Sequence, residues 1–117
     1  NNIIYSRPFD FFDNINLSIN SYCVLSDSGS LFEESFLLNY PAVSVRKSNE
    51  RIEGIETGST IMSGYDSNTI IKSIKVSRAM NYINQHSDYN GGLVSQKICK
   101  IILSYYHKIN EKIWYKK

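Results

Sequence analysis

The sequence lacks an excess of either charge. Its 117 residues carry thirteen lysines and arginines against eleven aspartates and glutamates, a formal net charge of +2. So small a charge gives no electrostatic reason to expect nucleic acid or an anionic membrane as a partner. The chain is also too short for two complete domains with a cleft between them. We expect neither nucleic-acid nor membrane binding, and any site must be argued from individual residues.

Cysteines and long apolar runs are equally scarce. The two cysteines, Cys23 and Cys99, each lie in an apolar run, so we expect buried free thiols and a reducing compartment. No apolar run approaches the roughly 20 residues that cross a bilayer, and no signal peptide is visible. His86, His107 and the cysteines have no zinc-site spacing, so we expect no metal and no cofactor. We infer a cytoplasmic protein.

Short apolar runs alternate with helical patterns along most of the chain. Runs at residues 3–5, 22–25, 42–45 and 59–62 predict four strands. Helical spacing follows a candidate cap at Asp10, recurs over residues 31–39, and resumes after a cap at Asp66 or Ser67. Short apolar strands separated by helices are typical of a parallel sheet covered on both faces. We therefore predict an α/β layered fold.

The last third of the chain has a different organisation. Residues 84–92 have loop composition with two adjacent glycines, which predicts a hinge between an α/β region at 1–83 and a long helix at 93–117. The apolar stripe of that helix is longer than a four-stranded sheet requires. We expect the helix to pack against a further domain or a second chain.

The turn between the second strand and its helix is the first candidate site. Ser28, Gly29 and Ser30 would present amides and hydroxyls at the carboxyl end of the sheet, where an anion is favoured. Ser30 and Glu33 also match the S-x-x-E capping box, which needs no ligand, and on physical grounds alone we favour this cap. Glu34 could accept both hydroxyls of a ribose, or be an acid favoured by the helix dipole.

A charged segment at residues 46–53 follows the next strand and hence lies at the same edge. It holds three cations and two acids in eight residues. Such a run is usually a solvated loop. Beside a helix N-terminus, however, one of its arginines could clamp a diphosphate through two hydrogen bonds.

In this order, these segments resemble the C-terminal domain of the non-hydrolysing UDP-N-acetylglucosamine 2-epimerases. That family carries a T/S-D-S-G-G-x-Q-E-E run, a K-P-V strand, a T-E-R-P-E loop and an A-G-T strand start. The matching stretches are Cys23–Ser35, Pro41–Arg46, Asn49–Glu53, Gly58 and Gly64. The tail, Lys100–Tyr105 with Trp114, is similar to the branch that makes UDP-N-acetyl-L-fucosamine for capsular polysaccharide and O-antigen.

The resemblance implies the UDP-binding C-terminal portion of an isomerase with a GT-B-type two-domain architecture. Its substrate would be a UDP-N-acetyl-hexosamine, inverted at C2 by elimination and re-addition of UDP. The resemblance further implies that Ser28, Gly29 and the amide of Ser30 hold phosphate. Glu34 would hold the ribose hydroxyls, and Arg51 would reach the diphosphate.

Three departures from the family pattern affect these assignments. Ser30 replaces a glycine, so an amide contact to phosphate requires a negative φ at this residue. Ile52 replaces a proline, which leaves Arg51 less restrained. Asn14 falls near the position of an aromatic ring that faces the uracil in many members, and is a possible base contact.

No residue is assigned a catalytic role. The family's catalytic carboxylates lie in an N-terminal domain and its histidine early in the C-terminal domain, and neither His86 nor His107 matches that histidine's motif. With no initiator methionine, we expect a fragment of a longer protein, inactive without its N-terminal domain and homodimeric in full-length form. Two alternatives stay open: a stand-alone nucleotide or anion-binding module, and the nucleotide-sugar half of a GT-B glycosyltransferase.

Overall fold

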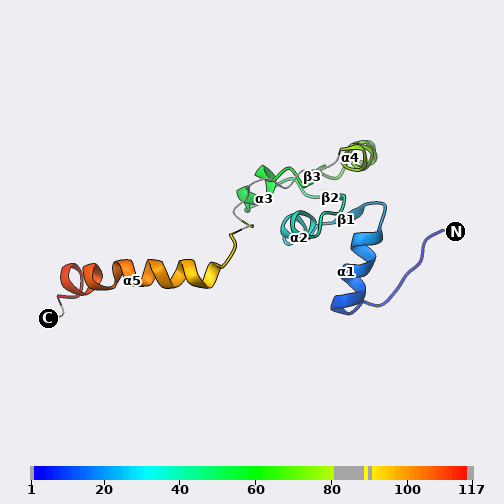
Figure 1. Cartoon of the computed structure of the whole chain (residues 1–117). Helices are drawn as coiled ribbons and strands as arrows, with labels where there is room; N and C mark the ends of the chain where they lie inside the picture. The colour runs from blue at the N-terminus through cyan, green and yellow to red at the C-terminus, as the bar shows by residue number, and fades with distance from the viewer. Residues whose placement is uncertain (1, 81–88, 90, 116–117) are drawn as a thin grey trace.

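The computed structural model describes residues 2–80, 89 and 91–115. Three short strands form one parallel sheet in the order β1-β2-β3, with Val43 paired between Leu25 and Ile61. The predicted α/β fold class is confirmed (Figure 1). The elements in chain order are α1 (Phe11–Asn20), β1 (Val24–Ser26), α2 (Leu31–Leu38), β2 (Ala42–Ser44), α3 (Ile52–Glu56), β3 (Thr60–Met62), α4 (Ser67–Ala79) and α5 (Val94–Lys112).

The central strand β2 is buried at all three positions because helices cover the sheet on both sides. Both α2 and α4 contact β2 and β3. From α4, the Ser77 hydroxyl donates to the Ala42 carbonyl at 3.3 Å. From α2, the Ser35 hydroxyl forms a hydrogen bond with that of Thr60 at 2.6 Å. A strand covered on both faces needs a continuous run of small or apolar residues. Residues 42–45 form such a run, and this pattern is the basis on which the strand is predicted.

The short helix α3 closes the core beside α2. Gly54 is buried there, and a Cβ atom built on it would lie 2.7 Å from the Cβ of Phe32, a fully buried side chain. Contacts this short do not occur between real carbon atoms. A glycine at position 54 is therefore what allows α3 to approach α2.

Two predicted helix starts are confirmed by their caps. An Asp10 carboxylate oxygen accepts from the Asp13 amide at 2.9 Å, at the start of α1. An Asp66 carboxylate oxygen accepts from both the amide and the hydroxyl of Thr69 at 2.8 Å, at the start of α4. The hydrogen bond from the amide is the main reason that the pKa of Asp66 is lowered. Each cap satisfies an amide that the helix itself leaves without an acceptor.

Two sequence-based expectations are wrong in the described residues, and one helix was not predicted. Residues 3–5 form no strand, and Ile4 is 92% exposed, because no neighbouring strand is present to pair with them. Helix α3 was not predicted, because five residues within a charged segment carry too little periodicity to reveal a helix. Cys23 and Cys99 are free thiols, but Cys23 is half-buried and Cys99 is exposed on α5.

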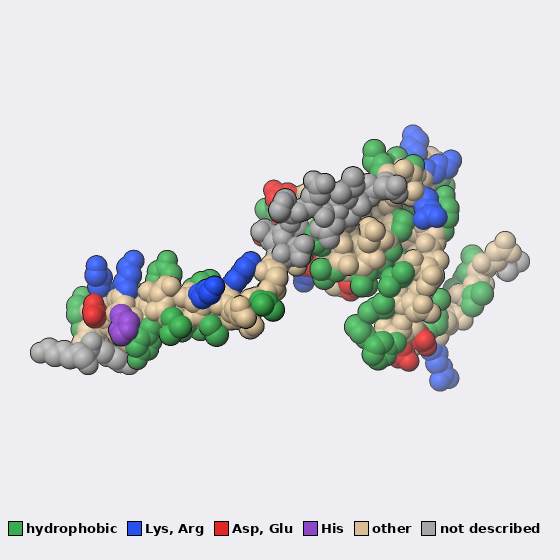
Figure 2. All heavy atoms as spheres, viewed as in Figure 1, with side chains coloured by type: hydrophobic (Ala, Val, Ile, Leu, Met, Phe, Trp, Pro, Cys, Tyr) green, Lys and Arg blue, Asp and Glu red, His purple; other side chains and the backbone are tan. Residues whose placement is uncertain are grey.

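The predicted C-terminal helix forms as α5, and it extends away from the sheet (Figure 1). None of its residues is buried. Lysines gather along one edge of the helix and hydrophobic side chains line much of the rest (Figure 2). No helix within the described residues is both long and apolar enough to cross a membrane. Most of the predicted hinge, 84–88 and 90, lies outside the described residues.

We predict that Gly54→Ala destabilises the fold by about 1–3 kcal/mol, because the added methyl group overpacks the contact with Phe32. Urea denaturation followed by circular dichroism measures this. Gly29→Ala is the matched control, since its Cβ would meet nothing closer than 3.6 Å and its φ is not in the left-handed region. Equal stability losses for the two variants would contradict the packing argument.

Candidate functional site

The turn that joins β1 to α2 leaves amide donors unused. The Ser28 amide donates to the Ser26 hydroxyl at 3.0 Å, and the hydroxyls of Ser28 and Ser30 lie 2.9 Å apart. Within the described part of the chain, the amides of Gly29 and Ser30 have no hydrogen-bond acceptor. Ser30 has a φ of −72°. The negative φ that an amide contact to phosphate requires at this serine is therefore present. Unused amides at a helix N-terminus suit an anion.

The capping box expected at this helix start does not form. The Ser30 side chain makes no cap hydrogen bond, and its hydroxyl pairs with that of Ser28 instead. The Glu33 carboxylate forms an ion pair with Arg51, eighteen residues away. The cap interpretation is therefore wrong, because a partner distant in sequence takes the side chain that the box requires.

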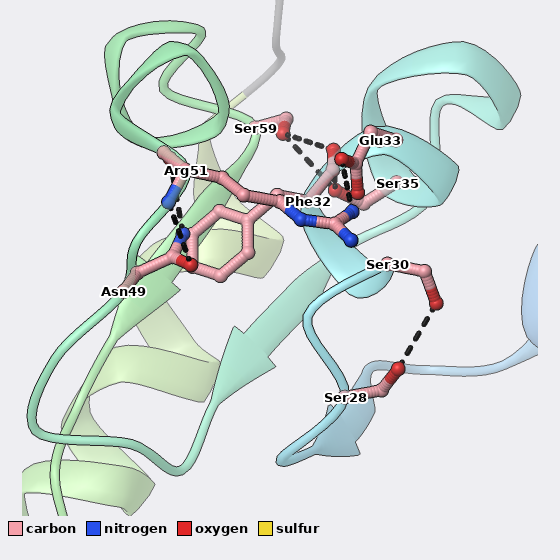
Figure 3. A network of polar contacts seen from close by, with 8 residues as sticks. All are labelled: Ser28, Ser30, Phe32, Glu33, Ser35, Asn49, Arg51 and Ser59. Carbon is pink, nitrogen blue, oxygen red and sulfur yellow. Dashed lines mark hydrogen bonds and ion pairs between the residues drawn. The ribbon is translucent and has the colours of Figure 1, made fainter.

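Two arginines from the loop after β2 reach the turn. A Cβ atom built on Gly29 would lie 3.6 Å from Nη1 of Arg46, and 3.9 Å from both Cζ and Nε of Arg51. Figure 3 shows Arg51 extending across Phe32 towards the start of α2. Arg51 therefore lies beside the turn, and its contact with a diphosphate stays a prediction. Sequence reasoning selected Arg51 and missed Arg46, whose equal proximity depends on how the loop folds back.

Arg51 is held at both ends. Its backbone amide donates to the side-chain oxygen of Asn49 at 3.2 Å, and the Asn49 side-chain amide donates to the Arg51 carbonyl at 3.1 Å. At the other end, hydrogen bonding to Glu33 and the charge of Glu33 raise the pKa of Arg51, which stays protonated. Arg46 forms an ion pair with Glu50 at 3.3 Å.

Glu34 lies on the other side of α2, towards α1. The Tyr40 hydroxyl donates to Oε2 of Glu34 at 3.4 Å. Burial raises the pKa of Tyr40 to about 12, the charge of Glu34 adds to this, and a hydrogen bond with Ser18 of α1 opposes it. Asn14 is exposed on α1, and its hydrogen bonds to Asp10 and Ser18 are local to the helix start. Among the described residues, Asn14 has no hydrogen bond with the turn.

The two histidines have no assigned role in the site. His107 is exposed on α5 with its ring against Tyr106, and His86 lies outside the described residues. Among residues 2–80, 89 and 91–115, no three His, Cys, Asp or Glu side chains are arranged to hold a metal ion.

Comparison with known proteins gives a consistent match. Residues 1–103 match the family model described as UDP-N-acetylglucosamine 2-epimerase. A curated UDP-N-acetylglucosamine 2-epimerase from Methanococcus maripaludis is 33% identical over 92 residues, which are 75% of this chain and 25% of the relative. Its counterpart from Yersinia pestis is 29% identical, over 86% of this chain and 28% of the relative. The chain thus spans about a quarter of the length of these relatives.

Two solved structures share the fold. A UDP-N-acetylglucosamine 2-epimerase from Rickettsia bellii is 40% identical with a TM-score of 0.72, over 92% of this chain and 31% of that one. A UDP-GlcNAc 2-epimerase from Neisseria meningitidis, bound to UDP-GlcNAc, is 26% identical with a TM-score of 0.65. This match covers 85% of this chain and 28% of the other.

We predict that Tyr40→Phe removes a loss of stability at high pH. The folded-state pKa of about 12 lies above the ordinary value of a tyrosine, which is about 10. The neutral phenol therefore contributes fully below about pH 10, and that contribution is lost as the pH rises towards about 12. Urea denaturation over this pH range should show the unsubstituted chain losing its advantage over the variant. A constant difference in unfolding free energy would contradict the assignment.

Proposed function

The chain belongs to the UDP-N-acetylglucosamine 2-epimerase family, and we propose that it forms the UDP-binding C-terminal portion of such an enzyme. The observation that carries this proposal is the meeting of two unused amides and two arginines at Gly29. The Neisseria meningitidis neighbour, solved with UDP-GlcNAc bound, supports a nucleotide sugar as the ligand class.

The diphosphate fits the side of the turn that faces the arginines. The amides of Gly29 and Ser30 offer two donors, and the positive end of the α2 dipole adds to their attraction for an anion. Arg46 and Arg51 can each donate more than one hydrogen bond to phosphate oxygens, since a guanidinium carries five N–H groups. Ser28 supplies a hydroxyl beside them.

The nucleoside fits the opposite side. Consecutive helical residues point about 100° apart, so Glu33 faces the arginine loop while Glu34 faces Tyr40 and α1. A ribose against Glu34 would place the base towards α1, the helix that carries Asn14. Glu34 would accept the two ribose hydroxyls, with Asn14 as a possible base contact once the ligand spans the gap between them.

In the elimination step proposed for the whole enzyme, the bond between C1 and the diphosphate oxygen breaks and UDP takes the electron pair. Arg46 and Arg51 would stabilise the negative charge that develops on that oxygen. Glu33 is paired with Arg51, and Glu34 accepts a hydrogen bond from Tyr40. Because the resemblance places the family's catalytic carboxylates in an N-terminal domain, we assign the base that removes the proton at C2 to that domain.

We also propose a pathway, a location and an oligomeric state for the whole enzyme. The tail similarity favours the branch that makes UDP-N-acetyl-L-fucosamine for capsule or O-antigen in the cytoplasm, by a homodimeric enzyme. The exposed apolar side chains of α5, which include Ile98, Ile101 and Ile102, are suited to packing against the N-terminal domain or a second subunit.

We predict that the chain binds UDP, and that Arg51→Ala weakens binding roughly ten- to a hundredfold by removing charge-assisted hydrogen bonds to phosphate. Arg46→Ala should weaken it to a similar degree, because both guanidinium groups lie at the same distance range from Gly29. Titration calorimetry with UDP, and amide-shift mapping at residues 26–34 and 46–53, measure these effects.

Glu34→Ala is the contrasting variant. It should leave affinity for inorganic pyrophosphate unchanged but remove the preference for UDP over its 2′-deoxy form, since a carboxylate needs both hydroxyls to accept from both. A chain that shows no amide shifts at either segment with millimolar UDP would contradict the proposed function.

We predict that the isolated chain does not catalyse exchange at C2. Since we assign the base to an N-terminal domain, a UDP-N-acetyl-hexosamine incubated with the chain in deuterium oxide should keep its C2 proton, as followed by NMR. The same chain mixed with an N-terminal domain of the family provides the positive control. Exchange by the purified chain alone, at stoichiometric concentration, would show that it holds its own base.

A further inference from the structure

Fold stability alone gives little reason for a glutamate at position 33. One carboxylate oxygen pairs with Arg51, but the other, Oε2, is buried and has no hydrogen-bond partner among the described residues. A buried carboxylate oxygen without a donor is costly. The capping role that would account for an acid at this position is not performed. The side chain also lies beside Tyr89: burial raises the pKa of that phenol, and the charge of Glu33 and a hydrogen bond with it add to the rise. The ion pair of the carboxylate is the one with Arg51.

That contact sets where Arg51 can donate. The pair engages Nη1 of Arg51, while Nε and Cζ lie 3.9 Å from the Cβ position of Gly29. The Nε side of the guanidinium therefore stays beside the turn and is not used by Glu33. Together with Asn49, which bonds the Arg51 backbone on both sides, Glu33 restrains the arginine at two points.

We propose that Glu33 is a positioning residue that presents Arg51 to the diphosphate. The inference rests on the proposed UDP site and supplies what the sequence lacks, because Ile52 stands where the family's loop has a proline. In this chain the restraint on Arg51 comes from side chains and not from a fixed backbone angle. Holding a long side chain in its bound conformation lowers the entropy cost of binding.

The direction in which UDP affinity changes when the Glu33 carboxylate is removed distinguishes a positioning role from competition with phosphate. If Glu33 positions Arg51, then Glu33→Ala should weaken UDP binding by about three- to tenfold, the range expected for losing one immobilised side chain. If Glu33 merely competes with phosphate for the arginine, the same variant should bind UDP more tightly. Glu33→Gln keeps an acceptor oxygen for Arg51 and should recover most of the affinity.

The matched control is Glu50→Ala, which removes the same charge from the acid paired with Arg46. Glu50 has a side chain that is 68% exposed, against 22% for Glu33. An exposed pair restrains its arginine less, so this variant should change UDP affinity by less than about twofold. The control separates positioning from a general change in electrostatic potential.

The test is a double-mutant cycle on the 117-residue chain, with UDP titrated by calorimetry and folding checked by circular dichroism. In the Arg51→Ala background, Glu33→Ala should no longer weaken binding, because it acts through that arginine. The NMR signal of the Arg51 Nε–H group in the free chain should also lose its distinct shift in Glu33→Ala and keep it in Glu50→Ala.

The outcomes separate the two proposals. If UDP does not bind, or Arg51→Ala binds as tightly as the unsubstituted chain, the proposed function fails and the positioning role fails with it. If Arg51→Ala weakens binding but Glu33→Ala leaves it unchanged or tightens it, the positioning role alone is overturned. An equal loss for Glu33→Ala in both backgrounds also overturns it.

Discussion

The packing of α2 against the sheet is the contact on which the rest of the structure depends. Phe32 and Phe36 are buried on its inner face, and between them the Ser35 hydroxyl reaches Thr60 and Ser59 on the β3 side. These contacts fix the rotation of α2 about its own axis. Because a helix turns by about 100° per residue, that rotation also decides where Glu33 and Glu34 point. The two acids therefore serve different sides of the turn without help from a local cap.

The sequence predicts the fold correctly where a segment has the pattern of a strand or helix and also has a neighbouring element with which to pair or pack. The apolar runs that became β1, β2 and β3 are short, contain few charges and are separated by helical spacing, which is sufficient to predict a parallel sheet. The run at residues 3–5 has the same composition but no strand beside it in the described chain, and pairing is a property of two segments. Helix α3 was not predicted because its sequence has no helical periodicity. It lies beside Phe32 because Gly54 allows the close approach, and a local pattern does not reveal that contact.

The site could be predicted only in part, because its decisive contacts join residues far apart in sequence. The turn Ser28–Ser30 was identified from its place between a strand and a helix, and the resemblance selected Arg51. Glu33 pairs with Arg51 instead of completing a capping box. This pairing depends on a loop eighteen residues away that folds back onto α2. Arg46 comes to Gly29 through the same fold of the loop. No local spacing rule contains this information, and the residue types at the sheet edge indicate only that an anion is a candidate ligand there.

Charge is balanced at the turn, where two arginines lie close to Gly29. Arg46 pairs with Glu50 and Arg51 with Glu33, so the four charges cancel. Each guanidinium has five N–H groups, and one acid does not use them all. In the proposed complex, a diphosphate would join the network without displacing either acid, using donors that already lie beside Gly29. Its recognition would then depend on the geometry of those donors and of the amides of Gly29 and Ser30, not on long-range attraction. This is consistent with a chain whose net charge is only +2.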